Sequence, residues 1–203
     1  MARVYSMQTR AEAGVATRAR LLDATAEVIA QLGGPGLTMQ AVAQKADVAL
    51  RTVYNYFSSK EDLVVEAYDR LASTTMAAAR ALPPSGSARQ DLAAFIGAYL
   101  DSYQTQIGAR VLVAGVPGLP ELDNRIAQVR RWRRDQLKKL IKAAHREGEL
   151  VLALPQAVAI AFLATAYPPW EILVLQLRMT PPAAKELILT TVDTSLFGAS
   201  PPN

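Results

Sequence analysis

The sequence predicts an all-α fold in which three N-terminal helices precede a larger helical bundle, with about nine helices in all. Apolar residues recur at helical spacing along nearly the whole chain, and no alternating run of β-branched residues bounded by turns is found. Glycines and prolines separate the helical segments. With 203 residues, 51% of them hydrophobic, and a net charge of +4, the chain can build one domain or two small ones, and a disordered chain is excluded.

Local signals delimit the first three predicted helices. The first runs from about residue 17 to 32 and stops at Gly33–Gly36; its inward stripe is Leu21, Leu22, Thr25, Val28, Ile29 and Leu32. Thr38 is placed to cap a helix over residues 39–45, which buries Met39, Val42 and Ala43. Asp47 lies in the next turn, where a left-handed residue is needed. A short helix over about 50–56 follows that turn.

The later helices are separated mainly by proline. Ser58 and Glu61 form a predicted capping box that opens a helix reaching about residue 81. Thr180 is placed to cap the last helix, with Pro181 at its first position. The full series of later helices is predicted at about 87–107, 110–115, 120–148, 155–177 with a break at Pro168–Pro169, and 181–198.

The residue types exclude much of enzyme and metal chemistry. The chain has no cysteine and a single histidine, His145, so disulfides, thiolate nucleophiles, Cys-based metal sites and His clusters are ruled out. It contains neither a G-x-S-x-G elbow nor a Gly-rich loop ending in GK[ST]. We therefore expect no enzyme, no metal site and no cofactor.

One uncharged stretch, Leu150–Trp170, is long enough to cross a bilayer. Pro155, Pro168 and Pro169 interrupt it, and a shorter apolar run of this kind is more typical of a buried core helix. The N-terminus also lacks the apolar core of a secretory signal. We therefore expect a soluble, cytoplasmic protein.

The segment Thr38–Leu63 has the pattern of a helix-turn-helix. On its second short helix, Leu50, Val53 and Phe57 share one face, which must pack on the preceding helix. The opposite side presents residues that suit a major groove, where Arg can bind guanine, Asn adenine, and Thr or Tyr the phosphates. These residues are Arg51, Thr52, Tyr54 and Asn55. A solvated polar face is the alternative for the helix pair taken alone.

The same stretch resembles the DNA-binding domain of the TetR (tetracycline repressor-like) transcriptional regulators. The resemblance rests on Leu21-Leu22, Gly33, Thr38, Val42-Ala43, Ala46, Val48 and Tyr54-x-x-Phe57-x-x-Lys60-Glu61-x-Leu63. It implies that Leu50, Arg51, Thr52 and Asn55 read bases, and that Thr38, Tyr54, Tyr56 and Lys60 hold the phosphate backbone. Two positions depart from the family: Asp47 stands where glycine is common, and Ala49 cannot cap the second short helix.

By the resemblance, the rest of the chain holds a small-molecule pocket and a dimer interface. Helices that mix small and large residues can pack closely, and two such pairs would form a four-helix seam between copies. The residues predicted for it are Val158, Ala161, Phe162, Thr165, Leu187, Ile188, Thr191 and Leu196. The predicted effector-binding residues are the aromatic side chains Tyr99, Tyr103, Trp132, Phe162, Tyr167 and Trp170. An ordinary core is the alternative for both sets.

Two groups of basic residues stay open to two interpretations. Residues 125–146 hold nine Lys or Arg and one acid, Asp135, which suits either a solvated face or an acidic effector such as an acyl-CoA. Arg3, Arg10, Arg18 and Arg20 can form either a basic arm that enters a minor groove or a solvated tail.

We therefore expect a homodimeric regulator that binds double-stranded DNA at a palindromic operator. We expect it to be a repressor that a small apolar or aromatic effector releases from that operator. Residues 1–62 form the arm and DNA-binding domain in this interpretation, and residues 63–203 the effector-binding and dimerisation domain. A ligand-independent regulator, an activator, and a helical small-molecule carrier without a specific operator stay open as alternatives.

Overall fold

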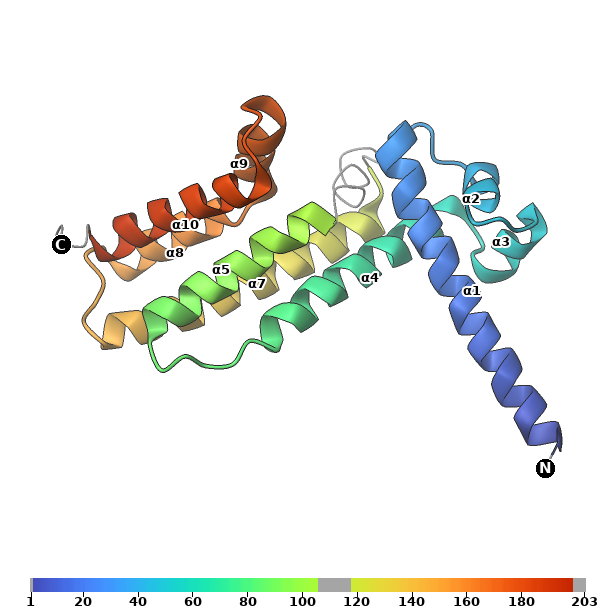
Figure 1. Cartoon of the computed structure of the whole chain (residues 1–203), viewed down its shortest axis with the longest axis horizontal. Helices are drawn as coiled ribbons and strands as arrows, with labels where there is room; N and C mark the ends of the chain where they lie inside the picture. The colour runs from blue at the N-terminus through green and yellow to red at the C-terminus, as the bar shows by residue number, and fades with distance from the viewer. Residues whose placement is uncertain (1, 106–117, 199–203) are drawn as a thin grey trace. The chain divides into compact units, whose positions relative to one another are not determined.

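The computed structural model describes residues 2–105 and 118–198, and among these the side chains of residues 12–103 and 118–198. Throughout the described residues the regular structure is helical, so the predicted all-α class is confirmed (Figure 1). Nine α-helices and one π-helical turn lie within the described ranges. The predicted short helix at 110–115 lies outside them.

The described residues form two compact units. The first contains those within 1–71 and 106–125, and the second those within 72–105 and 126–203. The first unit holds α1 (Ala2–Leu32), α2 (Met39–Lys45), α3 (Leu50–Tyr56) and the beginning of α4 (Lys60–Arg80). The boundary passes through α4 and α7 (Pro120–Arg146), whereas the sequence suggested a division after residue 62.

The second unit is a helical bundle around an apolar core. It contains α5 (Ala88–Thr105), most of α7, α8 (Leu154–Ala164), α9 (Tyr167–Glu171), the π-helical η1 (Ile172–Gln176) and α10 (Pro181–Phe197). α10 packs on both α5 and α8, and a Phe95–Trp132 ring contact at 6.0 Å joins α5 to α7 (Figure 1). Tyr103, Leu137 and Ala161 are fully covered in its centre.

The first unit follows the predicted pattern with two corrections on α1. Five of the six stripe residues are buried, but Leu32 is 60% exposed because the helix ends there and the chain turns away at Gly33 (φ 71°). The helix also begins at Ala2 rather than near residue 17. The N-terminal segment, for which the sequence left a basic arm or a solvated tail open, is therefore helical from Ala2.

Another correction concerns the start of α4. The predicted Ser58–Glu61 capping box is shifted by one residue, because Ser59 caps the helix: its Oγ accepts a hydrogen bond from the Asp62 amide at 3.0 Å. Ser58 instead donates a hydrogen bond to the Asp62 carboxylate. Thr180 does cap α10 as predicted, accepting from the Ala183 amide at 3.4 Å.

The prolines of the apolar stretch act as helix starts. Pro155 lies in the first turn of α8, and Pro168 and Pro169 lie in the first turn of α9, so the predicted break falls at Thr165–Ala166. No single described helix is both long and apolar enough for a bilayer; α8 and the segment Tyr167–Gln176 reach that length and composition only as a pair bent by 48°.

Candidate nucleic-acid interface

Thr38 begins α2 and stays exposed. Its Oγ1 accepts a hydrogen bond from the Ala41 amide at 3.0 Å, as the capping prediction requires. Met39, Val42 and Ala43 of the same helix are buried, as predicted. Because the cap uses the hydroxyl only as an acceptor, its O–H can still donate to a phosphate oxygen.

The turn between α2 and α3 has the predicted left-handed residue. Asp47 has φ 52°, and the Val48 amide donates to the Ala43 carbonyl at 3.0 Å. An aspartate tolerates this conformation better than most residues other than glycine. The turn is therefore formed without the glycine that is common at this position.

Burial on one side fixes α3 within the first unit. Val53 is fully covered and Phe57, which follows the helix, is 2% exposed. Leu50, expected on the same face, is 36% exposed and thus lies at its edge. Ala49 makes no side-chain cap, as predicted. A seven-residue helix without a cap is stable only through this packing.

The other side of α3 carries side chains that are free to bind. Arg51, Tyr54 and Asn55 are exposed, and Thr52 is partly exposed. Within the part of the chain that the structure describes, Arg51, Tyr54 and Asn55 form no hydrogen bond or ion pair. Guanidinium, phenol and amide groups held in this way are the types that contact base edges and phosphates.

The two remaining phosphate candidates lie close to other groups of the first unit. Tyr56 is partly buried, and its hydroxyl lies beside Gly14, at 3.7 Å from where a Cβ would stand. Lys60 is the first residue of α4, where an anion would be favoured. The exposed Glu61 and Asp62 share that turn, and hydrogen bonds from Ser58 and Ser59 lower the pKa of Asp62. These carboxylates compete with a phosphate there.

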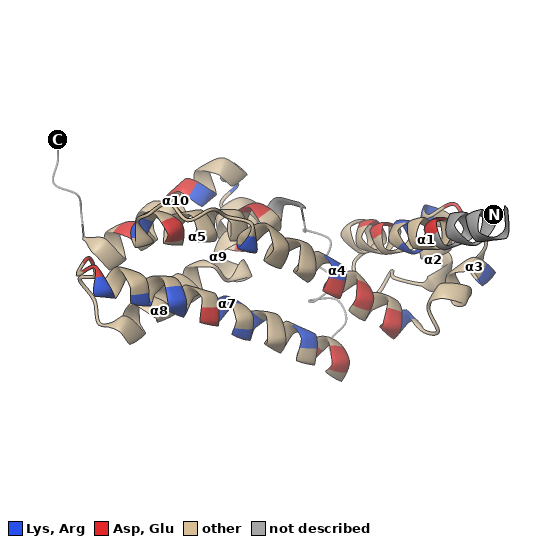
Figure 2. Cartoon of the chain, turned by 90° about the horizontal axis from the view of Figure 1, so that it is seen from below, with Lys and Arg blue, Asp and Glu red and all other residues tan. Residues whose placement is uncertain are grey.

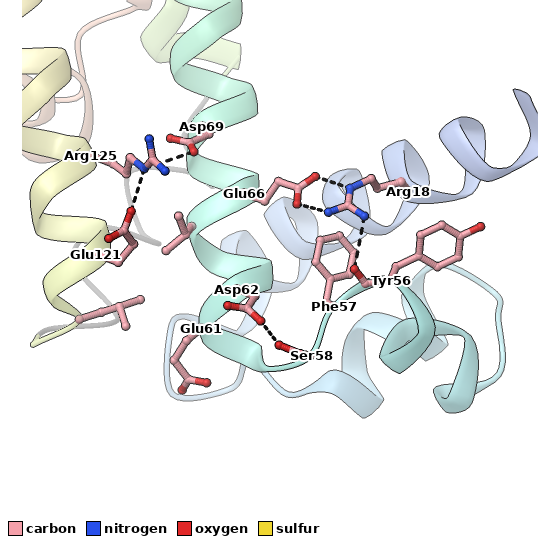
Figure 3. Close-up of a pocket in the computed structure, with 12 residues that line it drawn as sticks. Arg18, Tyr56, Phe57, Ser58, Glu61, Asp62, Glu66, Asp69, Glu121 and Arg125 are labelled. Atoms are coloured by element: carbon pink, nitrogen blue, oxygen red, sulfur yellow. Dashed lines mark hydrogen bonds and ion pairs between the residues drawn. The ribbon is translucent and has the colours of Figure 1, made fainter. Parts of the chain in front are cut away.

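Arg18 holds α1 against α4 and the end of α3, a role that the sequence analysis missed. Its guanidinium forms a bidentate ion pair with the Glu66 carboxylate (Figure 3). It also donates a hydrogen bond to the Tyr56 carbonyl at 3.3 Å, and it lies 4.8 Å from the centre of the Phe57 ring. Hydrogen bonds to Glu66 raise the pKa of Arg18. A side chain held in this way is not part of a flexible arm; Arg20 is exposed, and the side chains of Arg3 and Arg10 lie outside the described residues.

A hollow of about 690 Å³ opens beside this ion pair, within the first unit (Figure 3). Arg125 on its far side lies 3.5 Å from Asp69 and 3.1 Å from Glu121. Burial raises the pKa of Asp69, although the positive charge of Arg125 opposes the shift. The two arginines that line the hollow are thus already paired with carboxylates. This favours a structural role for these side chains over the binding of a ligand.

The aromatic residues predicted to bind an effector form one cluster in the second unit. Tyr103 stands at its centre, with ring centroids 5.7 Å from Tyr99, 5.6 Å from Tyr167 and 6.1 Å from Trp170. Phe95, which the prediction missed, connects Tyr99 at 6.2 Å with Trp132 at 6.0 Å. Phe162 joins through Arg133, whose guanidinium lies 4.3 Å from the ring centre.

Half of the residues predicted for a dimer interface are buried inside the chain, where α8 and α10 pack on each other. These residues are Ala161, Thr165, Ile188 and Leu196. A side chain that is already covered within one chain has no surface left for a second copy, so these four serve the chain's own core.

The other four keep some exposed surface. Leu187 is 45% exposed and Thr191 is exposed, whereas Val158 and Phe162 are partly buried. Leu163 of α8, which was not among the predicted residues, is 66% exposed. Of the predicted residues, only these four keep appreciable exposed surface within the part of the chain that the structure describes.

The basic residues of α7 fall into two groups. Figure 2 shows that Lys and Arg recur along α7. Most of them are exposed: Arg130, Arg131, Arg134, Lys138, Lys139 and Lys142. Arg133 differs, since only 5% of it is exposed. The exposed group remains compatible with either a solvated face or an acidic ligand.

Comparisons with known proteins point to one family. A sequence profile of bacterial regulatory proteins of the tetR family matches residues 21–67. Over 53 residues the chain is 47% identical to the HTH-type transcriptional repressor KstR of Mycolicibacterium smegmatis, which is 26% of each protein. The chain thus matches about a quarter of the length of that relative.

Solved structures resemble the chain over nearly its full length. PfmR, a TetR family transcriptional regulator from Thermus thermophilus, has a TM-score of 0.72 at 21% identity, covering 90% of this chain and 97% of that one. FadR from Bacillus subtilis, solved in complex with stearoyl-CoA, has a TM-score of 0.67 at 18% identity, covering 87% and 97%. At these identities the likeness shows the fold. The profile match and the helix-turn-helix geometry show that residues 21–67 carry the domain of the tetR family of bacterial regulatory proteins, and the rest of the chain shares the fold of these solved regulators.

Proposed function

We propose that this protein is a homodimeric transcriptional repressor that binds a palindromic operator in double-stranded DNA and leaves it when a small molecule binds the second unit. It acts in the cytoplasm, where bacterial DNA is accessible. Residues 1–62 bind DNA, and residues 63–203 bind the effector and the second copy. The matched relative is a repressor by its name, which supports repression over activation.

The observation that carries this proposal is the two-sided character of α3. Val53 and Phe57 anchor it in the core, while Arg51, Tyr54 and Asn55 are exposed. A rigidly placed helix with exposed polar side chains is what a major groove accepts, and its N-terminal residues then reach the base edges. We assign base reading to Leu50, Arg51, Thr52 and Asn55, and phosphate contacts to Thr38, Tyr54, Tyr56 and Lys60.

The dimer is proposed to form through the exposed faces of α8 and α10. Leu163 and Leu187 are large apolar side chains left uncovered there, and Thr191 is a small exposed neighbour. In a symmetric dimer both copies use the same surface, so each of these residues would contact the α8–α10 surface of the second copy. The two copies of α3, related in this way by the symmetry of the dimer, require two half-sites at a fixed helical spacing and hence a palindrome.

Release by an effector is proposed to work through the aromatic cluster of the second unit. The binding of stearoyl-CoA by the structurally similar FadR supports a ligand site in such a bundle. Effector and operator must then weaken each other's binding by the same factor, with a coupling of about 1–3 kcal/mol.

The test is selection and sequencing of genomic fragments bound by the purified protein at a stated moderate salt concentration. A recurrent palindrome supports the proposal, and fragments without a shared sequence contradict it and favour a carrier. Arg51→Ala should relax the base preference at one position per half-site, whereas Arg131→Ala, on an exposed part of α7, should leave the selected sequence unchanged. Equal operator affinity with and without each candidate effector would favour a ligand-independent regulator.

A further inference from the structure

Arg133 is a buried cation without an acidic partner. Only 5% of the residue is exposed, and within the described ranges no carboxylate forms an ion pair with it. Arg125 on the same helix, in contrast, has both Asp69 and Glu121 within 3.5 Å. Buried charges in proteins are nearly always paired because desolvation of an isolated ion is very costly.

The contacts of Arg133 satisfy only part of its guanidinium. Nη1 donates to the Thr165 carbonyl at 2.5 Å and lies 3.5 Å from the Tyr103 hydroxyl. The group also lies 5.2 Å from the Tyr99 ring centre and 4.3 Å from that of Phe162. Nε is buried and has no hydrogen-bond partner in the described structure.

The partners that are present do not neutralise the positive charge. The Thr165 carbonyl stands at the C-terminal end of α8, where the helix dipole supplies about half a negative charge at most. That carbonyl also accepts a hydrogen bond from the Tyr103 hydroxyl at 2.5 Å. One shared carbonyl and two aromatic faces leave the edge formed by Nε and Nη2 available for another acceptor.

We propose that Arg133 binds the carboxylate of an effector whose remaining part is aromatic or aliphatic. The Nε–Nη2 edge of a guanidinium matches the two oxygens of a carboxylate in parallel hydrogen bonds. Tyr99 and Phe162 beside the guanidinium, and Trp170 further along the same aromatic cluster, suit an apolar body. This inference rests on the proposed effector site and names its ligand class: an organic acid of this kind, anchored inside the bundle.

The position of Phe162 gives this binding a physical consequence. Nε is covered in the present arrangement, and Phe162, which is only partly buried, lies nearest to the guanidinium among the rings. A carboxylate reaches Nε when this ring moves aside. Because Phe162 belongs to α8, ligand entry would then alter the packing of a helix that is also proposed to face the second copy.

The two tryptophans of the chain provide a local probe. Trp132 and Trp170 both belong to this core, so intrinsic fluorescence reports on the cluster and requires no operator. We would titrate the full chain with 4-phenylbutyrate and decanoate, each compared with its primary amide at equal concentrations. The expected result is that the carboxylates bind about 10- to 100-fold more tightly than the amides, the range for hydrogen bonds to a charged group.

Variants then assign the preference to one side chain. Arg133→Met should remove the preference for the acid and leave binding of the amides within about twofold. Arg133→Lys should retain part of it, since an ammonium supplies charge without the planar two-donor edge. Arg20→Met, exposed on α1 and outside both the aromatic cluster and the basic face of α7, is the control and should bind like the wild type.

Equal binding of acids and amides by the wild-type chain would overturn the inference, as would failure of every carboxylate to bind. So would an Arg133→Met variant that folds and still prefers the acids, because Arg133 would then only cap α8. If that variant does not fold, the wild-type comparison and Arg133→Lys decide the question. The two proposals fail separately. If a neutral effector releases the operator but the acids do not bind, only the role of Arg133 is refuted. If the acids bind but no palindrome is selected, only the proposed function is refuted.

Discussion

Replacing Arg18 with methionine is expected to weaken DNA binding while leaving its salt dependence unchanged. The Arg18 side chain joins α1 to Glu66 of α4, to the Tyr56 carbonyl at the end of α3 and to the Phe57 ring. These contacts fix the C-terminal end of α3, the helix proposed to enter the major groove. The methionine variant keeps much of the apolar length but removes the charge, so α3 should open locally more often.

The expected magnitude follows from the exposure of each contact. The side chains of Arg18 and Glu66 are 43% and 36% exposed, so solvent screening limits their ion pair to about 0.2–1 kcal/mol. The contact with the Phe57 ring adds about 0.5–1 kcal/mol. Arg18→Met should therefore destabilise the α3–α4 junction by about 1–2 kcal/mol, and Glu66→Gln, which removes only the ion pair, by about 0.2–1 kcal/mol.

Amide hydrogen exchange over residues 50–66 measures this directly, since it reports local opening. Protection there should fall about 5- to 30-fold in Arg18→Met and less in Glu66→Gln. The double variant should show a coupling of about 0.2–1 kcal/mol. Arg20→Met, an exposed neighbour on α1, is the matched control and should show no change.

Operator binding at several salt concentrations separates this explanation from a minor-groove arm. If Arg18 contacted a phosphate, the salt slope would fall by about one on its removal, and Glu66→Gln would leave the affinity unchanged. A lower salt slope in Arg18→Met, an unchanged affinity in Glu66→Gln and unchanged amide hydrogen exchange over α3 would together refute the role assigned to Arg18.

Three further predictions test single positions. Thr38→Ala should lower the stability of the first unit by about 1 kcal/mol in urea unfolding followed by circular dichroism, because the Ala41 amide loses its acceptor, and Thr38→Ser should restore it. Leu50→Gln should change the selected operator sequence, and unchanged base preference would contradict its assignment to base reading. Hydrogen bonds from Ser85 hold the pKa of Asp91 below its ordinary value of 3.8. Its stabilising contribution is therefore complete above that pH and lost as pH falls through the lower folded-state pKa. The free energies of unfolding of the wild type and Asp91→Asn should therefore become equal at low pH. A difference in free energy that stays constant with pH would contradict this.

Local signals predicted most helix boundaries. Thr38 and Thr180 each cap a helix through an amide three residues away, a bond decided within one turn of chain. Pro155 and Pro181 likewise begin helices because proline fits the first turn. The shift from Ser58 to Ser59 at α4 shows the limit of such signals, because two adjacent serines offer the same chemistry and only the path of the chain selects one.

Distant contacts could not be predicted in the same way. The sequence left Arg18 open between a basic arm and a solvated tail and could not reveal its partner, because Glu66 lies 48 residues further along the chain. Arg133 looked like one of several basic residues on α7, and nothing in its neighbours distinguishes the one that turns inward. Helical periodicity also selected Ala161 and Leu196 for a dimer interface, since it cannot separate a face buried within a chain from one buried between chains.

The sequence by itself therefore determined the all-α class, the helix-turn-helix with its exposed α3 residues, and the likeness of residues 21–67 to the tetR family. These depend on spacing, capping and short-range packing, which act over a few residues. Only the tertiary structure decided which charged side chains are paired, which apolar faces are already covered, and where a cation is left without an acid. Those outcomes depend on which segments meet in space. Burial changes the desolvation free energy of a charged side chain far more than the adjacent residues in the sequence do.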